Sequence, residues 1–112
     1  MRHLLLLSLL LTPAAASAHA ILVQSQPAAQ STVKAGPTTL VLRYNSRIDH
    51  ERSRLTLRGT NAETTLPLKP DSPADTLAAS AELTPGNYVL HWQVLAVDGH
   101  MTRGDVRFSV TK

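Results

Sequence analysis

A strict two-residue alternation in residues 88–94, YVLHWQV, constrains the fold of this chain more than any other feature. The apolar side chains dominate the even positions, and the polar His91 and Gln93 alternate with them. Successive side chains of a β-strand point to opposite faces of the sheet, so one face of this segment is expected in a core. Residues 40–44, LVLRY, and 106–110, VRFSV, repeat the pattern. Trp92 is accordingly expected in the core and not on a ligand-binding surface.

Short alternating and β-branched segments recur along the chain, separated by Pro, Gly, Asn and Asp. We predict strands at residues 21–25, 39–44, 53–58, 64–68, 76–83, 87–97 and 104–111. No helical apolar period of useful length appears after residue 18. Seven strands in about a hundred residues predict an all-β fold, a seven-stranded antiparallel Greek-key β-sandwich or barrel of Ig-like or cupredoxin-like type.

The first 18 residues have the pattern of an export signal. A short positive start precedes the apolar run at residues 4–11, and residues 16–18, ASA, form a small-residue cleavage site. The run is too short to span a bilayer, which needs about 20 apolar residues. Cleavage after Ala18 divides the chain into a signal peptide, 1–18, and one domain, 19–112. His19 then becomes the first residue of the mature protein.

The chain has 112 residues, with 11 basic and 8 acidic side chains and no cysteine. The lack of cysteine excludes disulfides, a lipoprotein anchor and a thiolate metal site. The small basic excess gives no indication of a nucleic-acid partner. The basic side chains do cluster in the sequence, and we interpret this cluster as a solvated strand face. It comprises Arg43, Arg47, Arg52, Arg54 and Arg58.

Two separate segments carry metal-binding chemistry. A leading His19 offers its α-amine and its ring Nδ1, whose pKa values lie near ~7.7–8 and ~6.5. Asp98 and His100 stand two positions apart at the end of a predicted strand, where their side chains point the same way. Three nitrogens and a carboxylate suit tetragonal Cu(II), although Zn(II) also uses two histidines and an aspartate. The expected metal ligands are therefore His19, Asp98 and His100, if tertiary structure brings them together.

Plainer interpretations compete with this one. Asp-Gly is a common turn pair, so Asp98-Gly99-His100 alone is a weak signal. A histidine directly after an Ala-x-Ala site is rarer, and the two segments together favour a metal site. Among the other histidines, His91 is expected on the outer face of its strand and His50 in a solvated charged loop. His3 leaves with the signal.

Three segments of the chain resemble the CopC-like periplasmic copper-binding, or copper resistance, protein family. Residues 19–28, HAILVQSQPA, are similar to the family's opening H-x-x-L-x-x-S-x-P-A, and residues 42–46, LRYNS, to L-x-F-S-E. Residues 88–104 are similar to Y-x-V-x-W-x-V-x-S-x-D-x-H-x-x-x-G. The resemblance covers nearly the whole expected mature chain. It implies a seven-stranded Greek-key fold and a periplasmic location.

The resemblance also implies a copper site and a partner. In the family one Cu(II) is held by the amino-terminal histidine, through amine and ring, and by the Asp and His of D-x-H; these roles fall on His19, Asp98 and His100. Ser46 stands where some members have a further carboxylate, with Asp49 nearby. Met101 is the only methionine after the signal, so a methionine-rich Cu(I) site is not expected. An inner-membrane copper permease of the CopD type is the implied partner, and a monomer is expected.

The resulting hypothesis is a periplasmic protein that sequesters or delivers Cu(II) through an amino-terminal histidine brace, and that is not an enzyme. The alternatives are a metal-free Ig-like exported interaction module and a small copper monooxygenase-like protein. The position of signal cleavage separates the first alternative from the copper hypothesis, because only the copper site requires His19 to be residue one.

Overall fold

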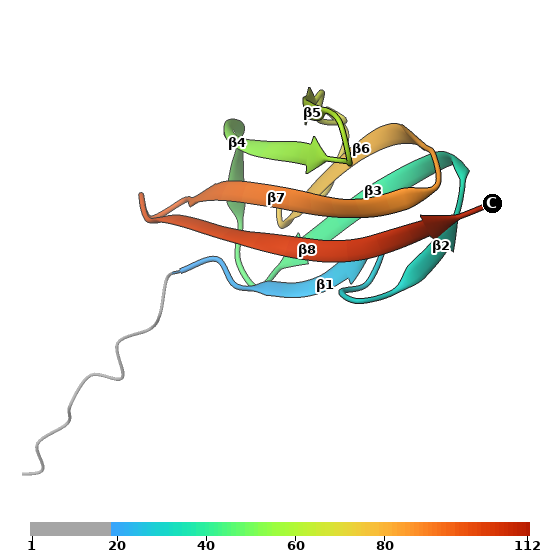
Figure 1. The fold of residues 1–112 in the computed structure, drawn as a ribbon. Coiled ribbons are helices and arrows are strands. Elements are labelled where there is room, and N and C mark those ends of the chain that lie inside the picture. The colour runs from blue at the N-terminus through green and yellow to red at the C-terminus, as the bar shows by residue number, and fades with distance from the viewer. Residues whose placement is uncertain (1–18) are drawn as a thin grey trace, which may run out of the picture.

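The computed structural model describes residues 19–112, and the expected signal peptide, its cleavage site and His3 lie outside them. The described chain forms eight strands (Figure 1). They are β1 (Leu22–Gln26), β2 (Thr32–Lys34), β3 (Gly36–Tyr44), β4 (Ile48–Arg58), β5 (Glu63–Leu66), β6 (Thr76–Leu83), β7 (Gly86–Ala96) and β8 (Met101–Thr111). Within residues 19–112, no helix has the length and apolar character needed to cross a membrane.

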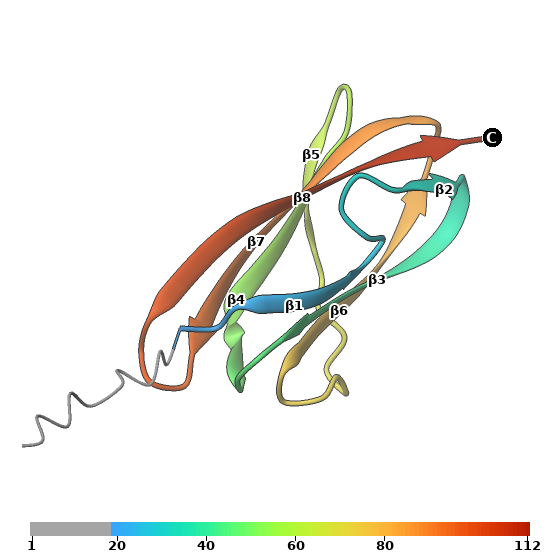
Figure 2. The ribbon, with the colours of Figure 1, turned by 90° about the horizontal axis from the view of Figure 1, so that it is seen from below.

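The strands form two sheets that pack face to face, as the sequence predicted. One sheet has the order β1-β3-β6 and the other β2-β8-β7-β4-β5, so the chain passes repeatedly from one sheet to the other. Figure 2 shows the long β7–β8 hairpin running the length of the larger sheet. Its turn lies beside the start of the described chain, whereas the C-terminus lies at the other end (Figures 1 and 2). This all-β sandwich confirms the predicted fold class.

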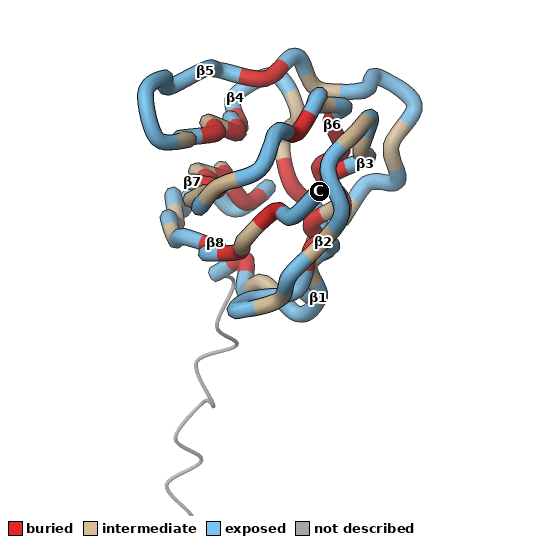
Figure 3. Tube along the Cα trace, turned by 45° about the vertical axis from the view of Figure 1, so that its right-hand side comes forward, coloured by how far each residue is buried: buried red, intermediate tan, exposed pale blue. Residues whose placement is uncertain are grey.

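The core lies between the sheets and is built from the residues of each strand that face inward. Buried stretches of the chain line the space between the two layers in Figure 3. Tyr44 and Trp92 meet there edge to face, with ring centroids 5.3 Å apart, and burial raises the pKa of the Tyr44 phenol. The indole also presses on Gly104, where a Cβ would lie only 2.4–2.9 Å from the ring atoms. The prediction that Trp92 is a core residue is thus confirmed.

The structure has one strand more than the seven predicted, and the addition is β2. This strand is three residues long and pairs in parallel with β8, with Thr32 opposite Ser109 and Lys34 opposite Thr111. Three residues are too few to show an alternation, which is why the sequence pattern did not reveal it. One pair of the sandwich is therefore parallel, while the other pairs are antiparallel.

Strands β4 and β8 begin earlier than predicted, at Ile48 instead of 53 and at Met101 instead of 104. In β4 the pairing with β7 shifts register between Asp49 and Arg54. Such a bulge inserts residues that break the two-residue period, so the pattern became readable only beyond it. β8 continues directly from the hairpin turn, and its first residues lack the apolar alternation seen later in the strand.

Candidate metal site

The turn between β7 and β8 positions Asp98 and His100. The Ala96 N–H donates to the His100 carbonyl over 2.8 Å, and the Gly99 N–H donates to the Ala96 carbonyl over 2.9 Å. Gly99 has φ of +94°, in the left-handed region that favours glycine. The two candidate ligands therefore stand on a hydrogen-bonded turn at the tip of the sandwich.

Asp98 is bonded to His100 in two ways. Its Oδ1 accepts from the His100 backbone N–H over 3.1 Å, and its Oδ2 lies 2.5 Å from His100 Nδ1. The side-chain bond to His100 is the main cause that lowers the pKa of Asp98, followed by the backbone bond, with smaller contributions from the charges of His100 and His19. Asp98 is thus a carboxylate at neutral pH. It occupies Nδ1 of His100 and leaves Nε2 as the nitrogen that can bind a ligand.

His19 is brought to the same place by the segment that leads into β1. The Thr102 hydroxyl donates to the Ala20 carbonyl over 2.9 Å, and Ala20 is buried. One residue later, the Ile21 N–H donates to Asn45 Oδ1 over 2.8 Å and the Asn45 N–H donates back to the Ile21 carbonyl. These bonds fix the chain beside the start of β8. The rings of His19 and His100 consequently lie 4.7 Å apart between centroids, inclined at 67°.

The imidazoles of His19 and His100 and the carboxylate of Asp98 are donors that suit a borderline divalent metal. In the described part of the chain these side chains do not converge on one point. Within residues 19–112, no three His, Cys, Asp or Glu side chains converge in a geometry that would hold an ion. In this arrangement the Asp98 carboxylate faces His100 Nδ1. A carboxylate on one ring nitrogen is how proteins commonly orient a histidine whose other nitrogen binds metal. Two adjacent imidazoles and a carboxylate are donors that suit Cu(II).

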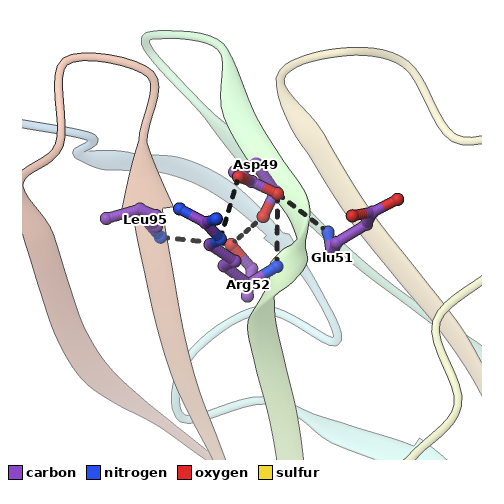
Figure 4. Close-up of polar contacts among 5 residues, drawn as sticks. Asp49, Glu51, Arg52 and Leu95 are labelled. Carbon is purple, nitrogen blue, oxygen red and sulfur yellow. Dashed lines mark hydrogen bonds and ion pairs between the residues drawn. The ribbon is translucent and has the colours of Figure 1, made fainter.

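Asp49 and Ser46 are the two further candidates for an additional metal ligand, and neither has a hydrogen bond to His19, Asp98 or His100 within residues 19–112. Figure 4 shows Asp49 closing the bulge of β4: its Oδ1 accepts from the N–H groups of Glu51 and Arg52 over 3.0 and 3.2 Å. The Ser53 hydroxyl donates to the Asp49 carbonyl and accepts from the Leu95 N–H, which ties the bulge to β7. Asp49 thus stabilises the strand locally. The Ser46 hydroxyl is buried and has no hydrogen-bond partner in the described part of the chain.

The other two histidines of the domain have separate roles. His91 lies on the outer face of β7, as expected, where its Nδ1 is 2.6 Å from Asp105 on β8. The expectation of a solvated loop for His50 is wrong. His50 lies on β4, half-buried, with Nε2 2.7 Å from the Thr76 carbonyl and 3.1 Å from the Pro73 carbonyl. The β4 bulge hid this placement, because no strand was readable around residue 50.

The sequence reasoning missed three exposed apolar residues that lie within two positions of the candidate ligands along the chain. Among residues 19–112 only four large apolar side chains are exposed, and three of them neighbour the candidate ligands. These three, which we call the apolar rim, are Ile21, Val97 and Met101, with 52, 68 and 41 % exposure. The Val97 N–H donates to the Arg47 carbonyl over 3.3 Å, next to the Asn45 that binds Ile21. Clustered exposed apolar side chains are typical of interaction surfaces.

Comparison with known proteins adds a decisive observation: the family model described as the CopC domain matches residues 22–111. The chain belongs to the CopC family. Protein YobA of Escherichia coli strain K12 is 35% identical over 98 residues, which cover 83% of this chain and 79% of YobA. Copper resistance protein C of Xanthomonas campestris pv. juglandis is 32% identical over 110 residues, covering 89% of this chain and 86% of that protein.

A solved relative confirms the fold of this CopC-family protein. The crystal structure of CopC from Methylosinus trichosporium OB3b superposes with a TM-score of 0.72 at 27% identity, over 82% of this chain and 93% of that one. The family comprises copper-binding and copper-resistance proteins, so a copper-related function is established for the chain at this level. The matched region begins at residue 22, just after His19.

Proposed function

We propose that this protein is a periplasmic Cu(II)-binding protein that sequesters or delivers copper, and that His19, Asp98 and His100 hold one ion per chain. The observation that carries the proposal is the 4.7 Å approach of the His19 and His100 ring centroids, from residues 81 positions apart in the sequence. Membership of a copper-binding family supports the choice of metal.

Each residue has a distinct chemical part in the proposed site. After removal of residues 1–18, His19 chelates through its α-amine and ring Nδ1, and His100 binds through the Nε2 that Asp98 leaves open. Asp98 contributes negative charge, and to serve as the third ligand its carboxylate turns from His100 Nδ1 toward the ion. Its lowered pKa keeps it ionised at neutral pH. Nitrogen-rich donors and one carboxylate favour Cu(II) over the softer Cu(I).

Proton competition follows from this donor set. Both imidazoles and the α-amine must lose protons to bind the ion, and their ordinary pKa values lie near ~6.5 and ~7.7–8. Apparent Cu(II) affinity is therefore expected to fall steadily from pH 8 to pH 5. A Cu(II) titration with the same affinity at both pH values would contradict an amine–imidazole site.

The exposure of the site supports exchange of copper with a second protein. The His100 side chain is 59 % exposed, so ligands from another molecule can approach the ion without unfolding the sandwich. The apolar rim of Ile21, Val97 and Met101 offers a contact surface around it. We propose that a membrane copper permease of the CopD type docks on this rim and receives or supplies the ion.

Native mass spectrometry of the domain beginning at His19 tests the proposal. One bound Cu(II) is expected for the wild-type domain, and His100→Ala should bind at least about tenfold more weakly because the opposing nitrogen is lost. The matched control is His91→Ala, which removes another exposed histidine that is also paired with an aspartate. Equal loss of copper in both variants, or none in either, would refute the assignment. A domain that binds no Cu(II) would instead favour the metal-free interaction module.

A further inference from the structure

The outer face of the five-stranded sheet carries two arginines on either side of one small apolar residue. Val89 on β7 lies opposite Arg58 on β4 and opposite Arg107 on β8. Neighbouring strands are about 4.8 Å apart, so the two arginine Cα atoms are separated by roughly 10 Å. Their long side chains extend from the same face and can approach one group above Val89.

A hollow of about 330 Å³ lies at this place. It is lined by the two arginines, by the polar residues Gln30, Asn87 and Ser109, and by Gly59, Tyr88, Val89 and Phe108. The Ser109 hydroxyl donates to Asn87 Oδ1 over 2.9 Å, which fixes one wall. The Gln30 N–H donates to the Arg107 carbonyl over 2.7 Å, which holds the turn against β8 and brings Gln30 to the rim. The hollow is thus built from three strands and a turn, and is not a gap beside a single loop.

The charge of the hollow is uncompensated. Neither arginine takes part in the ion pairs found within residues 19–112, which join Arg52 to Asp49, His91 to Asp105 and His100 to Asp98. Glu63 lies opposite Arg58 in the β4–β5 register, but the two side chains form no ion pair. No acidic residue lines the hollow. Two guanidinium groups with amide and hydroxyl groups around them are the chemistry that recognises phosphate and other oxyanions.

A second arginine pair on the same face provides an internal contrast. Arg54 and Arg103 flank Gln93 just as Arg58 and Arg107 flank Val89. There, however, Arg103 Nε donates to Gln93 Oε1 over 3.0 Å, and neither arginine lines the hollow. A merely solvated basic face would treat the two pairs alike. The two pairs differ in that only the first lines the hollow and only the second has a guanidinium bonded to the intervening side chain.

We propose that the hollow between Arg58 and Arg107 binds an oxyanion of the phosphate type, either free or as the headgroup of an anionic lipid. The site is independent of the proposed copper site. Val89 and the end of β7 are separated by seven residues, or roughly 25 Å of extended strand. The proposal therefore adds a second binding site at the opposite end of the sandwich, and it does not rest on copper binding.

Inorganic phosphate is the first probe, titrated into the ¹⁵N-labelled domain at constant ionic strength with chloride as the reference anion. Saturable shifts are expected for the amides of residues 87–89 and 107–109. Arg58→Ala/Arg107→Ala should weaken phosphate binding by at least about tenfold, because both charge-assisted bonds are lost. Arg54→Ala/Arg103→Ala removes the same charge from the same face and should change the affinity less than twofold. Equal weakening in the two double variants, or no saturable shift in the wild type, would overturn the proposal.

A second arm identifies the source of the oxyanion. Vesicles of phosphatidylglycerol and of phosphatidylcholine are sedimented with the wild type and with both double variants. Retention on phosphatidylglycerol that is lost only in Arg58→Ala/Arg107→Ala indicates a headgroup, whereas phosphate binding without retention indicates a free anion. Arg58→Lys/Arg107→Lys keeps the charge but loses the planar guanidinium groups that can donate two parallel hydrogen bonds, and should bind phosphate with intermediate affinity. Cu(II) binding should be unchanged in every variant, which separates this test from that of the copper site.

Discussion

Leu90 and His100 belong to the same β7–β8 hairpin, yet Leu90 is fully buried while 59 % of the His100 side chain is exposed. Around Leu90, apolar side chains from both sheets form one continuous core. Around His100, a short turn and a few hydrogen bonds hold polar groups at the surface. None of the three candidate ligands belongs to the core. Because the candidate ligands lie outside the core, we expect the sandwich to fold without the proposed copper ion.

The largest effect is expected from the core. Leu90→Ala removes a fully buried side chain, which typically costs about 2–5 kcal/mol of unfolding free energy. In a domain of about 100 residues each kcal/mol lowers the melting temperature by roughly 4–8 °C. Thermal unfolding followed by circular dichroism should therefore shift by ten degrees or more, whereas His100→Ala should shift little. Similar shifts in the two variants would show that the site is part of the folding core.

Cu(II) bound at the exposed β7–β8 turn should stabilise the fold. A ligand that binds only the native state at a thousandfold excess over its Kd adds about 4 kcal/mol. We expect the copper-free domain to melt cooperatively and Cu(II) to raise the melting temperature by more than ten degrees. His100→Ala should reduce this increase and His91→Ala should retain it in full. Cu(I) should give a much smaller increase, because Met101 is the only soft side chain in the domain. An unfolded copper-free domain would contradict the separation of core and site.

A smaller effect is expected for the acid titration of Asp98 in the metal-free domain. Its pKa is lowered chiefly by the hydrogen bond from His100. Its ionised form therefore favours folding above the ordinary aspartate pKa near ~3.9, and this contribution is lost as the pH falls through the lower folded value. NMR of the Asp98 carboxyl carbon should show a midpoint below the ordinary value. In His100→Ala the midpoint should return to it; an unchanged midpoint would mean that His100 is not the cause.

The contrast between core and tip also explains what the sequence could reveal. Trp92 and the inward face of β7 were predictable because burial imposes a two-residue period over a whole strand. The pairing of Asp98 with His100 was suggested by their spacing, since both stand on one turn. The approach of His19 to His100 was not derivable, because it depends on contacts such as Thr102 with Ala20 that leave no pattern.

The features that escaped sequence reasoning share a physical cause. β2 is too short to show a two-residue alternation of apolar side chains. The β4 bulge interrupts that alternation, and the strand around His50 was therefore not recognised. The apolar rim and the hollow between Arg58 and Arg107 arise where different strands meet. Along the chain, Arg58 was indistinguishable from Arg54, because only the register with β7 and β8 separates the residues that line the hollow from those that do not.

The most direct test of the copper site is the Cu(II) affinity of the domain beginning at His19, compared with the same domain carrying one additional residue, Ala18. The extension turns the His19 α-amine into a peptide nitrogen and leaves the sandwich, Asp98 and His100 unchanged. We expect tight one-to-one binding to the authentic start and an affinity loss beyond the ~10–100-fold that removal of an outer-sphere partner costs. Equal Cu(II) affinity of the two proteins would contradict the proposed site.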